Sequence, residues 1–104
     1  MIEELEIYGF GSFFKECVKF QDIDILIVHF SNKYESCQFA ISCKQMLLSN
    51  LNYADVTILS KTEELQTLFI EKSNAIHLGK VCEVSVVKDL QAILNRIKQF
   101  VKSE

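Results

Sequence analysis

The fold of this chain is decided by residues 22–30, which read DIDILIVHF. The stretch is rich in β-branched residues, and its length is that of one buried strand. Because side chains alternate along a strand, Ile23, Ile25 and Ile27 point to one face and the two aspartates to the other. The stretch therefore predicts a strand that packs its isoleucines into a core and carries two carboxylates at its start.

Apolar spacing on both sides of this strand predicts the neighbouring elements. Residues 5–10 alternate loosely and predict a first strand that ends in a tight turn. Apolar residues spaced by three and four predict a helix over about residues 34–49, and residues 53–60 return to strand composition. Ser60 and Glu63 then predict a capping box at the start of a further helix.

The rest of the chain predicts a short strand between two helices. The capped helix carries Leu65, Leu68 and Phe69. A short strand over residues 75–78 precedes Gly79, with residues 81–87 as an alternative strand. The final helix places one apolar stripe on its surface: Val87, Leu90, Leu94, Ile97 and Val101. This order predicts an α/β (α+β) fold, a small mixed sheet with helices packed on it.

Length and charge exclude several classes of protein. The chain has 104 residues, 49% of them apolar, so we expect a single domain over residues 1–104. Eleven basic and fourteen acidic residues give a net charge of −3, which offers no strong nucleic-acid footprint. The longest apolar run, residues 25–28, is too short to span a membrane, and no signal peptide is evident. We therefore expect a cytoplasmic protein without a membrane partner.

The cysteines argue against two common kinds of site. Cys17, Cys37, Cys43 and Cys82 include no pair with C-x-x-C spacing, unlike a zinc ribbon or a thioredoxin motif. In a cytoplasmic protein we expect reduced thiols, and a buried cysteine then acts as a small hydrophobic side chain.

Asp22 and Asp24 share one face at the start of the second strand. Like charges held this close repel, and a divalent cation would neutralise them. Oxygen ligands without a histidine or cysteine cluster favour Mg²⁺ or Mn²⁺. Asp55 opens the next strand and completes a three-carboxylate cluster if the two strands are neighbours. Three carboxylates can hold two metal ions for phosphoryl transfer.

The turn at Gly11 and Ser12 supplies hydrogen-bond donors, which carboxylates cannot supply. The chain has no proline and three glycines, Gly9, Gly11 and Gly79, so two close glycines mark an unusual backbone site. Backbone N–H groups and the hydroxyl of Ser12 suit the terminal phosphates of a nucleotide. A dinucleotide-binding motif does not fit, because Phe14 occupies the third glycine position.

Each of these features alone has an ordinary structural explanation. Two aspartates at a strand edge often serve only to keep the edge solvated, and most Gly-Ser pairs are simple turns. His29 and His77 are predicted to be partly exposed structural histidines. The functional reading of the turn and the carboxylates rests on their order: a strand, Gly11-Ser12, a ten-residue gap, a buried strand with two aspartates, and a later aspartate.

This arrangement resembles the minimal nucleotidyltransferases of the DNA polymerase beta superfamily over about residues 7–60. The resemblance implies a palm-like fold in which Gly11 and Ser12 hold the triphosphate. It implies that Asp22 and Asp24 bind metal. Asp55 matches the third carboxylate, which positions or activates the acceptor hydroxyl and binds one metal.

The chain departs from the family's pattern after the Gly-Ser turn. Phe13 and Phe14 follow, where many members have a basic residue and a polar stretch, and Gln21 replaces a small polar residue. Lys15 or Lys19 is the expected source of the missing positive charge. The two phenylalanines, beside the expected site, could stack on a base.

Two functions from different classes follow. The first is an enzyme that transfers a nucleoside monophosphate from an NTP to a hydroxyl on a partner protein, RNA or small molecule and releases pyrophosphate. Small family members paired with a helical toxin protein modify the toxin in this way, which makes a partner protein a candidate acceptor. The second is a non-catalytic, antitoxin-like module that acts on a partner protein by contact. A homo-oligomer is left open.

Overall fold

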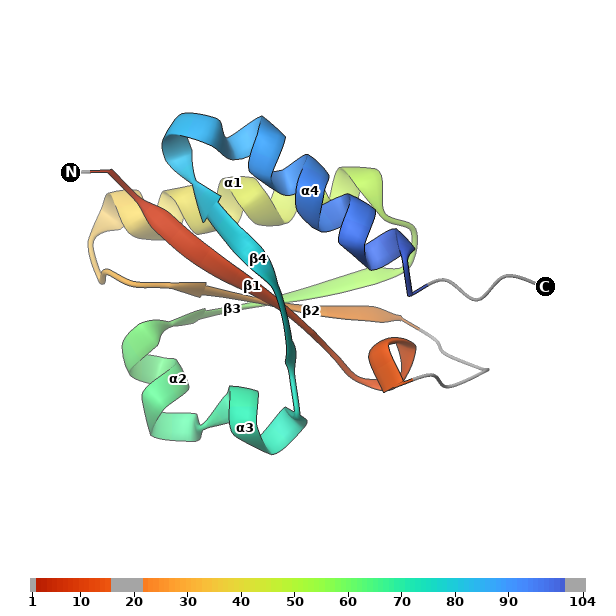
Figure 1. Cartoon of the computed structure of the whole chain (residues 1–104). Helices are drawn as coiled ribbons and strands as arrows, with labels where there is room; N and C mark the ends of the chain where they lie inside the picture. The colour runs from red at the N-terminus through yellow and green to blue at the C-terminus, as the bar shows by residue number, and fades with distance from the viewer. Residues whose placement is uncertain (1, 16–21, 101–104) are drawn as a thin grey trace.

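The computed structural model describes residues 2–15 and 22–100. Its centre is a mixed four-stranded sheet with the strand order β3-β2-β1-β4 (Figure 1). β1 is antiparallel to both β2 and β4, whereas β2 and β3 are parallel. In chain order the strands are β1 (Glu4–Phe10), β2 (Ile23–His29), β3 (Ala54–Ser60) and β4 (Ile76–Cys82). The predicted small mixed α/β sheet is confirmed.

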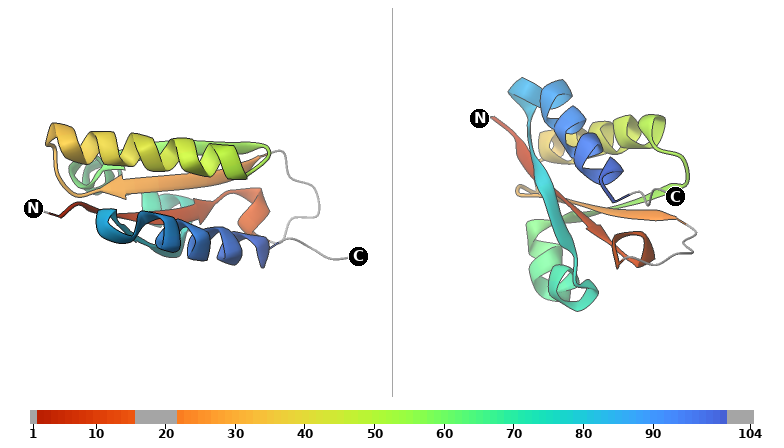
Figure 2. Two further views of the ribbon diagram at one scale, coloured as in Figure 1. Left: turned by 90° about the horizontal axis from the view of Figure 1, so that it is seen from above. Right: turned by 45° about the vertical axis from the view of Figure 1, so that its right-hand side comes forward.

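Helices lie on both sides of the sheet but cover them unequally. The two long helices, α1 and α4, lie side by side on one face, and the short α2 and α3 lie on the other (Figures 1 and 2). Two 3₁₀ helices follow β1 and β4. The bounds are η1 (Ser12–Lys15), α1 (Tyr34–Asn50), α2 (Lys61–Thr67), α3 (Phe69–Ser73), η2 (Glu83–Ser85) and α4 (Val86–Lys98).

The core lies between the sheet and the layer formed by α1 and α4. Alternation in β2 is as the sequence predicts, because Ile23, Ile25 and Ile27 all belong to this core. The other strands contribute Leu5, Ile7, Val56, Leu78 and Val81, and the helices contribute Ala40, Cys43, Leu47, Leu90, Ile93, Leu94 and Ile97. The alternate β2 residues Leu26 and Val28 are also buried, and alternation places them on the face where α2 and α3 lie.

The predicted capping box is confirmed, but the helix that it begins is shorter than predicted. Ser60 Oγ accepts a hydrogen bond from Glu63 N–H at 3.1 Å, and Ser60 N–H donates to Glu63 Oε1 at 2.8 Å. A single helix through Leu68 is wrong, because Leu68 has φ 53° and separates α2 from α3. The buried Glu64 spans this break: its Oε2 accepts a hydrogen bond from Ile70 N–H at 3.0 Å.

Two further expectations for the C-terminal part are wrong. The strand does not end before Gly79 but continues to Cys82, because Gly79 leaves room for Ile93 of α4 above it. Val87 does not lie on the buried stripe of the last helix: its side chain is 74% exposed, and Ile93 is buried instead. Val101 lies outside the described residues.

No helix in the described parts of the chain is long and apolar enough to cross a membrane.

Gly9→Ala should destabilise the fold, because a Cβ at this position would lie 2.5 Å from ring atoms of Phe14. Overpacking of this kind costs about 1–3 kcal/mol, measured as the free energy of unfolding in urea. Adding Phe14→Leu should cost less in the Gly9→Ala background than in the wild type, since the smaller side chain makes room. Equal costs of Phe14→Leu in both backgrounds would contradict the proposed contact.

Candidate functional site

The three predicted carboxylates gather where β2 and β3 begin. Asp24 and Asp55 are direct partners in the parallel pairing of the two strands, so the expected neighbourhood of these strands is confirmed. Asp22 is exposed and lies immediately before β2. Because Ile23 and Ile25 face the core, alternation places Asp24 on the opposite face of the sheet.

The glycine turn lies directly against Asp24. Phe10, the last residue of β1, is the antiparallel partner of Asp24, and the chain then turns at Gly11 with φ +81°. A Cβ at Gly11 would collide with Asp24 Oδ2. Glycine is therefore needed at position 11 for two reasons: the left-handed backbone conformation and the close approach to the carboxylate. The structure brings together the turn and the acid that are 13 residues apart in the sequence.

Ser12 and Lys15 occupy the two ends of η1. Ser12 is half-buried and follows Gly11 directly, and Phe14 N–H donates a hydrogen bond to Gly11 O at 3.3 Å, which closes the turn. Lys15 is exposed at the last position of η1. Two residues named above, Lys19 and Gln21, lie outside the described residues.

Burial and the neighbouring carboxylates both disfavour the charged form of Asp24. Partial burial raises the pKa of the Asp24 carboxyl, and the negative charges of Asp55 and Asp22 raise it further. Within residues 2–15 and 22–100, no hydrogen bond or ion pair joins these three carboxylates to another side chain or to the backbone. Among the described residues, the three carboxylates thus have no hydrogen-bond or ion-pair partner.

The donor chemistry of this cluster fits a hard divalent cation such as Mg²⁺ or Mn²⁺. As the described side chains stand, however, no group of three or more His, Cys, Asp or Glu residues is arranged around a common point. Asp22 and Asp55 are exposed, and exposed side chains change rotamer within nanoseconds. Ligation by all three carboxylates therefore requires these two to turn toward Asp24.

The expectation that Phe13 and Phe14 stack on a base is wrong. Their exposed fractions are 5% and 4%, and both belong to the core. Their rings meet edge to face at 4.9 Å, and Phe14 makes a similar contact with Phe100 at 5.0 Å. The 3₁₀ turn buries both rings against the sheet, so they do not fill the space beside the carboxylates.

Both histidines have partners within the protein. His29 is buried at the far end of β2, and its Nδ1 lies 3.1 Å from Ser36 Oγ and 2.9 Å from the Ser31 carbonyl oxygen. His77 is exposed, and its Nε2 lies 2.6 Å from Glu6 Oε1. The buried Cys43 is inert, because burial raises the pKa of its thiol to about 11.

One residue beside the carboxylates could not be recognised as a site residue from the sequence. Tyr53 precedes β3, its side chain is 77% exposed, and its backbone has φ 61°. Its carbonyl oxygen accepts a hydrogen bond from Ile23 N–H at 2.8 Å, which ties it to the segment between Asp22 and Asp24. The sequence carries no signal for this conformation at a tyrosine, because Asn52 next to it is the residue type that adopts it more readily.

No protein-family model, curated protein or solved structure matches this chain.

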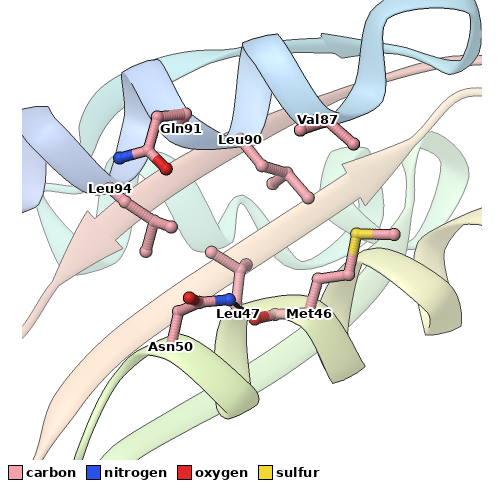
Figure 3. A pocket seen from close by; sticks show the side chains of 7 residues that line it. All are labelled: Met46, Leu47, Asn50, Val87, Leu90, Gln91 and Leu94. Atoms are coloured by element: carbon pink, nitrogen blue, oxygen red, sulfur yellow. Dashed lines mark hydrogen bonds between the residues drawn. The ribbon is translucent and has the colours of Figure 1, made fainter.

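A hollow of about 260 Å³ lies elsewhere, between α1 and α4 (Figure 3). Its lining residues are mostly apolar: Met46, Leu47, Asn50, Val87, Leu90, Gln91 and Leu94. It lies in the helical layer, whereas the carboxylates lie at the start of β2 and β3, on the sheet face that alternation turns away from these helices. This apolar hollow and the polar site are thus separate surfaces.

Asp24→Asn should stabilise the fold at pH 7. The pKa of Asp24 is higher in the folded than in the unfolded protein, so ionisation of this carboxyl makes the folded state less stable as the pH rises. The stability gained by Asp24→Asn should therefore vanish below pH 3.8, where Asp24 is protonated in both the folded and the unfolded state. Asp89→Asn is the matched control with the opposite sign, because hydrogen bonds from Cys82 N–H and the Ser85 hydroxyl lower the pKa of Asp89. Urea unfolding at pH 3 and pH 7 checks both. A loss of stability in Asp24→Asn at pH 7 would contradict the repulsion.

Proposed function

We propose that this chain is a nucleotidyltransferase of the DNA polymerase beta type, which transfers a nucleoside monophosphate from an NTP to a hydroxyl group. The observation that carries the proposal is the contact between the Gly11 turn and Asp24, with Asp55 paired beside Asp24 on the next strand. A phosphate-binding turn and a pair of carboxylates at one place are the parts that phosphoryl transfer needs.

The architecture supports the same family. The superfamily motif is a strand ending in Gly-Ser, followed by two aspartates on the next strand and a third carboxylate. Here β1 ends at the turn, β2 carries Asp24 and follows Asp22, and β3 carries Asp55. The mixed sheet has its two long helices on the face opposite to Asp24, which leaves the carboxylates accessible. We therefore propose the palm-like nucleotidyltransferase fold.

In the proposed reaction each part of the site has one task. The backbone N–H groups of the turn and the Ser12 hydroxyl bind phosphate oxygens, and the exposed Lys15 supplies positive charge. Mg²⁺ or Mn²⁺ held by Asp22, Asp24 and Asp55 would neutralise the charge of the phosphates and of the attacking oxygen. Asp55 orients the acceptor hydroxyl and accepts its proton, the hydroxyl oxygen forms a bond to the α-phosphorus, and the bond from the α-phosphorus to the oxygen of the leaving pyrophosphate breaks.

We propose a partner protein as the acceptor, by analogy with the small family members that modify a paired toxin. The burial of Phe13 and Phe14 supports catalysis, because these side chains do not occupy the place of a nucleotide.

A non-catalytic, antitoxin-like module is the second candidate. The observation that favours it is the apolar hollow between α1 and α4, which offers surface for contact away from the carboxylates. In that case a partner would bind whether or not Asp55 is intact.

Mg²⁺ should raise the melting temperature of the protein. A cation at one hundred times its Kd stabilises the folded state by about 2.7 kcal/mol. Asp24→Asn should lose most of this rise, and Asp89→Asn, remote from the site, should keep it. The measurement is a melting curve at several Mg²⁺ concentrations with EDTA reversal. The same rise in wild type and Asp24→Asn would exclude this metal site.

Asp55→Asn should separate binding from turnover. If Asp55 acts mainly on the attacking hydroxyl, the variant should keep most of its NTP affinity and lose transfer by roughly hundredfold or more. The assay combines the chain, labelled NTP, Mg²⁺ and the protein encoded by the neighbouring gene, and it detects added nucleoside monophosphate by mass. Complex formation unaffected by Asp55→Asn, without transfer by the wild type, would favour the contact module.

A further inference from the structure

Tyr53 combines two unfavourable features at one position. Its side chain is more exposed than any other large hydrophobic side chain in the described part of the protein. Its backbone has φ 61°, which a bulky residue adopts at a cost and a glycine does not. A glycine or asparagine would serve the turn better on both counts. Packing and turn geometry therefore give no reason for an aromatic ring here.

The backbone of Tyr53 is fixed relative to the carboxylates. Tyr53 O accepts the N–H of Ile23, the residue between Asp22 and Asp24, at 2.8 Å. In sequence, only Ala54 separates Tyr53 from Asp55. The ring is thus attached to a backbone segment that the sheet holds beside the carboxylates, and it is exposed, so it is free to turn toward them.

The chemistry of the ring selects one part of a nucleotide. A neutral phenol cannot replace the cationic groups that phosphates need, whereas every base offers a flat face for stacking. Phe13 and Phe14 are buried and unable to take this role. We propose that Tyr53 stacks on the base of the NTP, an inference that rests on the proposed nucleotidyltransferase function.

The test compares nucleotides with a ligand that has no base. Calorimetry in Mg²⁺ measures the Kd of each common ribonucleoside triphosphate and of inorganic triphosphate. Tyr53→Gly and Tyr53→Asn should raise the Kd of the preferred nucleotide about tenfold and leave that of triphosphate unchanged. Tyr53→Phe should keep the wild-type affinity for both.

Leu68→Gly is the matched control, because Leu68 is another bulky residue with positive φ and lies at the α2–α3 junction. It should relieve the same backbone strain and change neither Kd. Nucleotide affinity unchanged in Tyr53→Gly and Tyr53→Asn, or an equal loss for triphosphate, would overturn stacking and leave the nucleotide site standing. A wild-type protein that binds neither ligand would overturn both proposals.

Discussion

The structure depends on the pairing of β2 along both of its edges. β2 is antiparallel to β1 on one side and parallel to β3 on the other, and it is buried from Ile25 to His29. This pairing aligns the start of β3 with the start of β2 and the end of β1 with both. The carboxylates and the glycine turn meet because three strands must be in register at that end of the sheet.

The sequence predicts the parts of this fold that depend on local patterns. β1, β2, α1, β3 and the capping box at Ser60 follow from alternation, helical spacing and a short-range motif. It fails where a partner lies far away in the chain. The continuation of β4 through Gly79, for example, depends on Ile93 of α4. The sequence also misses the break at Leu68, where the partner is local: Glu64 Oε2 accepts a hydrogen bond from Ile70 N–H, six residues away.

The candidate site, too, can be predicted from the sequence only in part. The neighbourhood of Asp24 and Asp55 is predictable because one buried strand followed by a helix and another strand favours parallel pairing. The contact of Gly11 with Asp24 requires the register of β1 with β2, and the burial of Phe14 depends on Gly9 and Phe100. In the sequence, Phe14 therefore differs from the family's active-site pattern, whereas in the structure it is a core residue.

The order of the strands also has a consequence during synthesis. Residues 4–60 carry the turn, all three carboxylates and the β2–β3 pairing, and they leave the ribosome before β4 and α4. β4 pairs only with β1, and α4 supplies four of the buried core side chains. Until these arrive, the outer edge of β1 has unpaired backbone groups and Leu5 and Ile7 lack their cover. Any pairing of β1, β2 and β3 that forms before β4 and α4 are made therefore leaves one edge of the sheet open to aggregation.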